Sequence, residues 1–222
     1  MKVVAVVSQK GGAGKTTLAV HLATCAHLAG FRTALVDLDP QATARSWGDR
    51  RQAKGPEVVS DHASRLGALL QAAKGNGADL VVVDTAPNAD QAALGAVKAA
   101  DLVIIPCRPA AFDLEAVEAT LGLATITRKP AWVVLNAAPN RGRIAEEAKA
   151  GLEERGAQCA PTVMCQRVAY SHSVIDGRTA LEFEPDGKAA EEVRDLFRWT
   201  CRQVGMSTRP HRRAGATGRS GT

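Results

Sequence analysis

A glycine-rich loop near the start of the sequence carries residues that could bind phosphate. Residues 8–17 read Ser-Gln-Lys-Gly-Gly-Ala-Gly-Lys-Thr-Thr and follow a short apolar run. Glycines allow backbone N–H groups to face an anion, Lys15 supplies positive charge for the β- and γ-phosphates, and the Thr16 hydroxyl can bind Mg²⁺. We therefore expect a nucleotide-phosphate site made of Lys10, Gly11, Gly12, Ala13, Gly14, Lys15, Thr16 and Thr17.

Carboxylates end two later apolar runs. Asp37 and Asp39 lie in Asp-Leu-Asp-Pro-Gln, and Asp84 follows Leu-Val-Val-Val. In an extended segment, residues two apart point the same way, so Asp37 and Asp39 can address one site. Asp84 would lie near Mg²⁺ together with Thr16, because it ends an apolar run that follows the phosphate loop. An alternative for Asp39-Pro40, compatible with the first, is a turn that caps the next helix.

Asn136 ends another apolar run, Val-Val-Leu-Asn. Its amide could pair with the donor and acceptor edge of adenine. The alternative is that Asn136 caps the following loop.

The segments that must position these residues alternate between short apolar runs and longer helical stretches. Strands are expected at Val3–Val7, Ala34–Asp37, Leu80–Asp84, Leu102–Pro106 and Trp132–Asn136, with weaker ones at Val58–Val59 and Pro161–Met164. Helices are expected at about 15–29, 41–53, 62–74, 90–98, 112–128, 142–155, 168–177 and 187–204. This order predicts an α/β fold with a doubly wound, mostly parallel sheet and helices on both faces. Ligands of such sheets bind at the carboxyl ends of the strands.

Composition excludes several classes of protein. The chain has 222 residues, 45% of them hydrophobic, and five cysteines without a C-x-x-C pair. We expect one domain over residues 1–204, with a core that needs neither disulfides nor zinc. No apolar run is long enough to span a bilayer and no signal peptide is visible, so we expect a cytoplasmic protein.

The net charge of +5 is concentrated in the tail, residues 205–222, which contains four arginines and no acid. We expect this tail to be mobile, because it has almost no large apolar residues. In the preceding helix, Arg194, Arg198 and Arg202 recur every four residues and could contact DNA phosphates. The alternative is a solvated face partly paired with neighbouring acids.

The phosphate loop departs from the usual G-x-x-x-x-G-K-[ST] pattern, because position 9 is Gln and Lys10 opens K-G-G-x-G-K-T. With the D-x-D-P-Q and L-V-V-V-D segments, this form resembles the ParA/MinD family of P-loop ATPases, and most closely the short ParA partition ATPases. The similarity covers about residues 1–204. Because the loop begins within ten residues of Met1, we expect no N-terminal DNA-binding domain of the kind that larger relatives carry.

The resemblance implies a role for each matching residue. Lys10 would act across a dimer on the partner's ATP, Lys15 would hold the phosphates, and Asp39 would orient the attacking water, which makes these three the predicted catalytic residues. Asp37 would hold a Mg²⁺-bound water, and Asp84 would lie near Mg²⁺. Gln166 and Arg167 would frame adenine beside Asn136.

The resemblance also implies a function: a Mg²⁺-dependent ATPase that dimerises with ATP and binds nucleoid DNA non-specifically. A ParB-like or cargo-adaptor partner would stimulate hydrolysis, so that plasmid, chromosome or other cargo is positioned. Two other readings stay open. One is a MinD-like membrane-cycling ATPase, which would need a C-terminal helix that binds lipid. The candidate is the apolar stripe from Val193 to Val204, although we expect that stripe to pack on the sheet. A metabolic enzyme or metal chaperone of the same fold is the other.

Overall fold

A six-stranded parallel sheet organises the molecule, which was analysed as a computed structural model that describes residues 1–87 and 89–209. The strand order is β3-β2-β4-β1-β5-β6. The strands are β1 (Lys2–Val6), β2 (Thr33–Asp37), β3 (Glu57–Ser60), β4 (Leu80–Asp84), β5 (Leu102–Cys107) and β6 (Ala131–Leu135). The predicted fold class and the weak strand at Val58–Val59 are both confirmed.

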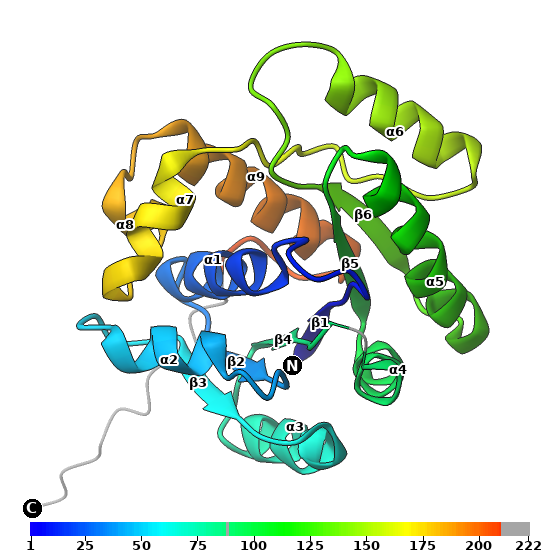
Figure 1. Ribbon diagram of the computed structural model, residues 1–222. Helices are drawn as coiled ribbons and strands as arrows, with labels where there is room; N and C mark the ends of the chain where they lie inside the picture. Colours follow the sequence, from blue (N-terminus) through cyan, green and yellow to red (C-terminus); the bar gives the residue numbers. More distant parts are fainter. Residues whose placement is uncertain (88, 210–222) are drawn as a thin grey trace, which may run out of the picture.

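Helices cover both faces of this sheet (Figure 1). The longer ones are α1 (Lys15–Leu28), α2 (Thr43–Arg50), α3 (Leu66–Gly75), α4 (Asp90–Ala99), α5 (Ala111–Thr127), α6 (Ile144–Glu154) and α9 (Lys188–Gln203). Shorter ones are α7 (Val168–Ser173) and α8 (Ala180–Phe183), with single 3₁₀ turns η1 (Ala63–Arg65) and η2 (Val174–Asp176). Each expected helix is present, with its ends shifted by a few residues.

Two apolar layers sandwich the strands because successive side chains of a strand point to opposite faces. Val4 and Val6 of β1 belong to the layer under α1, α2 and α9. Val3 and Ala5 belong to the layer under α3, α4, α5 and α6. The apolar runs of the sequence are thus strands buried on both sides, and their carboxyl ends carry the predicted site residues.

The segment Pro161–Met164 is not a strand, so that prediction was wrong. Isolated bridges join this part of the chain to β6 and the segment after it, from Cys159 to Val133 and from Cys165 to Ala138. The Ala160 N–H donates to Val133 O and the Met164 N–H donates to Leu135 O. Between these two bonds the chain leaves the backbone hydrogen-bond ladder with β6, and Pro161 has no N–H to donate.

Helix α8 was not expected, although the sequence carries its start signal. Thr179 and Glu182 form a capping box, in which each side chain accepts from the other residue's backbone N–H at the helix start. The T-x-x-E spacing could have predicted a helix there.

No helix within the described ranges is both long and apolar enough to cross a membrane. Of the tail expected to be mobile, residues 210–222, including Arg212, Arg213 and Arg219, lie outside the described residues.

Candidate nucleotide-binding site

The phosphate loop joins β1 to α1, and its shape is fixed by internal contacts. The Lys15 ammonium donates to the Lys10 carbonyl across the loop at 3.1 Å. Gly14, the residue before α1, has φ 92°, a left-handed conformation that favours glycine. A Cβ at Gly14 would also collide with the Asn136 amide. That amide donates to the Ala13 carbonyl at 2.7 Å, so β6 holds the loop from the side.

Three charged groups meet behind this loop at the carboxyl edge of the sheet. Asp37 and Asp84 are partners in the register of β2 with β4, and Val6, which precedes the loop, is paired with Asp84 on the other side. Lys15 is 6% exposed and both acids are fully buried. Burial lowers the pKa of Lys15, and the charges of Asp84 and Asp39 oppose that effect. The structure thus brings together Lys15, Thr16, Asp37 and Asp84.

Asp84 has unused bonding capacity. Neither of its carboxylate oxygens has a hydrogen-bond partner among the described residues. Burial raises its pKa to about 7, while the Thr16 hydroxyl and the Lys15 ammonium work in the opposite direction. A buried carboxylate without a partner is costly, and a hard divalent cation such as Mg²⁺ would remove that cost. The residues at this edge therefore fit a Mg²⁺-nucleotide.

Asp37 and Asp39 differ in what they bind. Both oxygens of Asp37 accept backbone N–H groups at 3.0 Å, from Asp39 and from Arg45 in the first turn of α2. Asp39 accepts the Gln41 N–H at 2.9 Å, in an Asx turn. The expected turn at Asp39 is thus present, but Asp37 rather than Asp39 reaches into the start of α2. Asp39 itself borders an open hollow with Gln41, His62 and Pro87.

A cavity of about 700 Å³ extends from the phosphate loop along α1. Gly14 and Thr17 form its phosphate end, and Asn136, Gln166 and Arg167 lie around the rest. The structure therefore brings the three residues that were predicted to contact adenine next to the phosphate loop. The Asn136 amide nitrogen is already bonded to Ala13, which leaves its second N–H and its oxygen for a ligand.

Glu192 of α9 binds the Arg167 side of this cavity, and no sequence pattern marks this residue. Its Oε1 accepts from Arg167 Nε at 2.8 Å and Nη2 at 2.5 Å. Its Oε2 accepts the Cys165 N–H at 3.1 Å and lies 2.9 Å from the Tyr170 hydroxyl. This contact raises the pKa of Arg167, and burial together with the Glu192 charge raises that of Tyr170. Arg167 is therefore cationic and Tyr170 neutral.

Helix α8 receives contacts from α1 and α2. His21 Nδ1 lies 2.7 Å from the Thr17 carbonyl, and its Nε2 accepts the Ala180 N–H at 3.0 Å. Arg51, just after α2, pairs with Glu182 at 2.8 Å, and its side chain is 4% exposed. These contacts join α8 to α1, which follows the phosphate loop, and to the end of α2.

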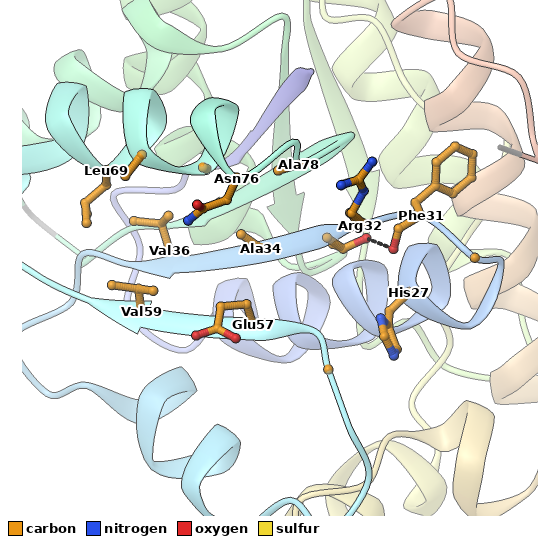
Figure 2. A pocket seen from close by; sticks show the side chains of 15 residues that line it. His27, Phe31, Arg32, Ala34, Val36, Glu57, Val59, Leu69, Asn76 and Ala78 are labelled. Carbon is orange, nitrogen blue, oxygen red and sulfur yellow. Dashed lines mark hydrogen bonds between the residues drawn. The ribbon is translucent and has the colours of Figure 1, made fainter. Parts of the chain in front are cut away.

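A second cavity, of about 720 Å³, lies at the other end of the sheet. Figure 2 shows Val36, Val59 and Leu69 around it, with Arg32 and Glu57 near its rim. The residues Arg32, Glu57 and Ala78 stand at or before the starts of β2, β3 and β4, so this cavity is at the amino edge. It contains none of the predicted site residues, and its lining is mostly apolar.

The three arginines predicted to contact DNA lie on α9, apart from the nucleotide cavity. Arg198 and Arg202 are exposed and Arg194 is half-buried. Arg198 forms an ion pair with Asp195. Arg198 and Arg202 line an outer groove together with Glu192. Arg198 therefore matches the alternative stated above, an arginine on a solvated face that is paired with a neighbouring acid. Arg202 is in no ion pair with the described residues.

Sequence comparison decides the family. Residues 4–180 match the family described as the CobQ/CobB/MinD/ParA nucleotide binding domain. The chain belongs to that family. It is 35% identical over 207 residues to the maintenance of carboxysome distribution protein A of Gloeobacter kilaueensis, covering 91% of this chain and 94% of the relative. It is 27% identical to the chromosome-partitioning ATPase Soj of Thermus thermophilus, covering 87% and 92%.

Solved structures agree on the fold of this ParA/MinD-type domain. The septum site-determining protein MinD of Pyrococcus horikoshii, complexed with Mg-ADP, superposes with a TM-score of 0.75 at 17% identity, covering 92% of this chain and 97% of that one. An ATP complex of Cyanothece McdA gives 0.70 at 16%, covering 93% and 97%. The predicted family and the P-loop NTPase fold are confirmed.

Proposed function

We propose that this ParA/MinD family member is a Mg²⁺-dependent ATPase whose nucleotide state controls dimerisation and binding to DNA, so that a large cargo is positioned. The observation that carries the proposal is the buried carboxylate of Asp84, whose oxygens have no hydrogen-bond partner in the part of the chain that the structure describes and which lies near Lys15 and Thr16. A divalent cation bound together with the nucleotide would supply the positive charge that balances this carboxylate.

The proposed chemistry is mainly positioning and neutralisation of charge. Thr16 and Asp84 would hold Mg²⁺, with Asp37 nearby, and the cation would neutralise charge that develops on the phosphates. Lys15 would bind the phosphates once it leaves the Lys10 carbonyl, its only hydrogen-bond acceptor within the described ranges. Asp39, which is not buried, would orient the water.

Lys10 is assigned to the dimer. Its backbone is bonded within the loop, but its ammonium makes no hydrogen bond or ion pair with the described residues. A second cation in one subunit would duplicate Lys15, whereas a cation offered to a neighbouring subunit couples nucleotide binding to dimerisation. We therefore assign Lys10 to the ATP of the partner subunit.

DNA is the proposed surface, and Arg202 is its first candidate contact. The membrane alternative is disfavoured by packing, because the apolar stripe of α9 is buried against the sheet and α1: Val193, Leu196, Phe197, Cys201 and Val204 are each at most 5% exposed. Names of relatives suggest the kind of cargo, since one distributes carboxysomes and another partitions chromosomes. A partner that stimulates hydrolysis belongs to the same proposal.

The nucleotide part of the proposal is tested with Lys15→Ala and Asp39→Ala. We expect Lys15→Ala to weaken ATP binding about 100-fold, because charge-assisted bonds to two phosphates are lost. Asp39→Ala should keep ATP binding, lower turnover at least about 100-fold and accumulate as a dimer. Lys98→Ala, an exposed lysine of α4, is the control. Calorimetry, phosphate release and light scattering measure the three quantities; normal hydrolysis by Asp39→Ala would refute the assignment.

The DNA part is tested by anisotropy with a random-sequence duplex, in ADP, ATP and a slowly hydrolysed analogue, at two salt concentrations. We expect binding only with ATP or the analogue, and weaker binding at higher salt. Arg202→Ala should reduce the salt slope by about one, whereas Arg143→Ala, an exposed arginine before α6, should not. Binding to liposomes instead of DNA would favour the MinD-like alternative, and binding to neither would contradict both.

A further inference from the structure

Glu192 is the shared acceptor for the segment that walls the base side of the nucleotide cavity. Cys165, Arg167 and Tyr170 all line that cavity, and all three are bonded to this one carboxylate from α9. Glu192 does not line the cavity itself; it lines the outer groove of α9 on the other side of the wall. It would therefore act on a bound nucleotide through the residues it holds.

The ion pair between Arg167 and Glu192 is a rigid contact. The Arg167 side chain is 22% exposed and that of Glu192 is 14% exposed, so the ion pair is shielded from solvent. Arg167 is also the residue immediately before α7, with an extended backbone at φ −132°. Fixing its guanidinium and the Cys165 N–H therefore fixes the start of α7 and, with it, the position of Tyr170. Charge-assisted bonds of this kind are roughly twice as strong as neutral ones.

Tyr170 connects Glu192 and Arg167 to α1, the helix that follows the phosphate loop. Its ring packs edge-on against His21 of α1, with centroids 5.0 Å apart. Its hydroxyl lies 3.0 Å from the Ala189 carbonyl in addition to Glu192. Because α9 and α1 are joined through this ring, the wall keeps its place relative to Thr17 at the phosphate end of the cavity.

We propose that Glu192 is a positioning residue of the nucleotide site, which sets the affinity for the base part of the nucleotide by holding Arg167, Tyr170 and the Cys165 N–H. This inference rests on the proposed nucleotide binding and names the residue that shapes its base side. The phosphate loop contributes independently, because its internal contacts involve Lys10, Lys15 and Asn136 but not Glu192.

The test separates the two ends of the ligand. Affinities for Mg²⁺-ATP and for inorganic tripolyphosphate, which has the phosphates without the base, are measured by calorimetry on the full chain. We expect Glu192→Gln to weaken ATP binding about 10-fold and to leave tripolyphosphate binding within about twofold. Glu191→Gln is the matched control, because Glu191 is the exposed neighbour on the same helix and should change neither affinity.

Tyr170→Phe is the second variant in case Glu192→Gln folds poorly. It removes one hydroxyl and keeps the ring, and we expect a loss of ATP affinity of about threefold with no change for tripolyphosphate. Equal losses for both ligands, or no loss for ATP in either variant, would overturn the inference. A wild-type chain that binds neither ligand would instead refute the proposed function, so the two failures are distinguishable.

Discussion

The two ends of the nucleotide cavity are built in opposite ways. At the phosphate end, polar groups are close together in the sequence or at strand ends, and some lack partners: the Asp84 carboxylate has none among the described residues. At the base end, the polar groups satisfy one another, as Arg167, Tyr170 and Glu192 do. The phosphate end is thus incomplete without a ligand, whereas the base end is a complete structure that a ligand can only fit. Replacing Arg167, Tyr170 or Glu192 should accordingly reduce folding stability, whereas replacing Asp84 should leave or increase it.

The largest expected effect tests another group of mutually satisfied polar residues, the Arg51–Glu182 ion pair between the end of α2 and α8. Arg51→Ala should lower the free energy of unfolding by about 3–5 kcal/mol, because it leaves Glu182 partly buried without its cation and removes the bond to the Gly177 carbonyl. Urea denaturation of the chain without nucleotide measures this. Arg50→Ala, an exposed neighbour, is the control and should cost less than about 1 kcal/mol. Equal, small losses for both variants would contradict the view that this buried pair stabilises the fold.

A smaller effect is expected from His21, which joins the two ends. Burial lowers its pKa to about 4, with opposing effects of the Thr17 carbonyl and the Glu182 charge. The unfolded chain therefore binds a proton that the folded chain does not between about pH 6.5 and pH 4. The contribution of His21 to stability should therefore fall as the pH is lowered through this window, by about 2 kcal/mol between pH 7 and pH 5. Asp84, whose pKa is raised by burial, acts in the opposite direction, so the effect of His21 is measured as a difference between variants.

Replacement of His21 isolates its share of that loss. His21→Gln should be less stable at pH 7 but lose about 2 kcal/mol less than wild type on going to pH 5. His172→Gln, at an exposed position, should behave like wild type. Both are followed by urea denaturation, and an unchanged pH dependence in His21→Gln would show that His21 is not neutral in the folded chain.

The smallest expected effect is a gain rather than a loss of folding stability, at the phosphate end of the cavity. Asp84→Asn should raise the stability of the nucleotide-free chain by about 1 kcal/mol at pH 8, because a buried carboxylate without a partner becomes a neutral amide. The same variant should lose the effect of Mg²⁺ on ATP affinity. Thermal denaturation and calorimetry measure the two changes, and a loss of stability would mean that the protein already compensates the Asp84 charge.

The same contrast explains what the sequence could predict. Residues 10–17, Asp37 and Asp84 could be predicted to lie together because each group of residues is contiguous or ends an apolar strand, and parallel strands end at one edge. Glu192 and Arg51 were not found, because their partners lie 25 and 131 positions away and no local pattern marks them. Pro161–Met164 was misassigned because apolar composition alone does not reveal that Pro161 interrupts the hydrogen-bond ladder. Only α8 was missed despite a visible signal.

The central place of β1 has a consequence for biosynthesis. Of the strands of the sheet this one is synthesised first, yet its neighbours are β4 and β5, which begin at Leu80 and Leu102. The phosphate loop that follows it is held by Asn136, 123 positions later. On the ribosome, where chains emerge from the N-terminus, β1 has no neighbouring strand until β4 has been synthesised, and the phosphate loop has no contact with Asn136 until β6 has followed.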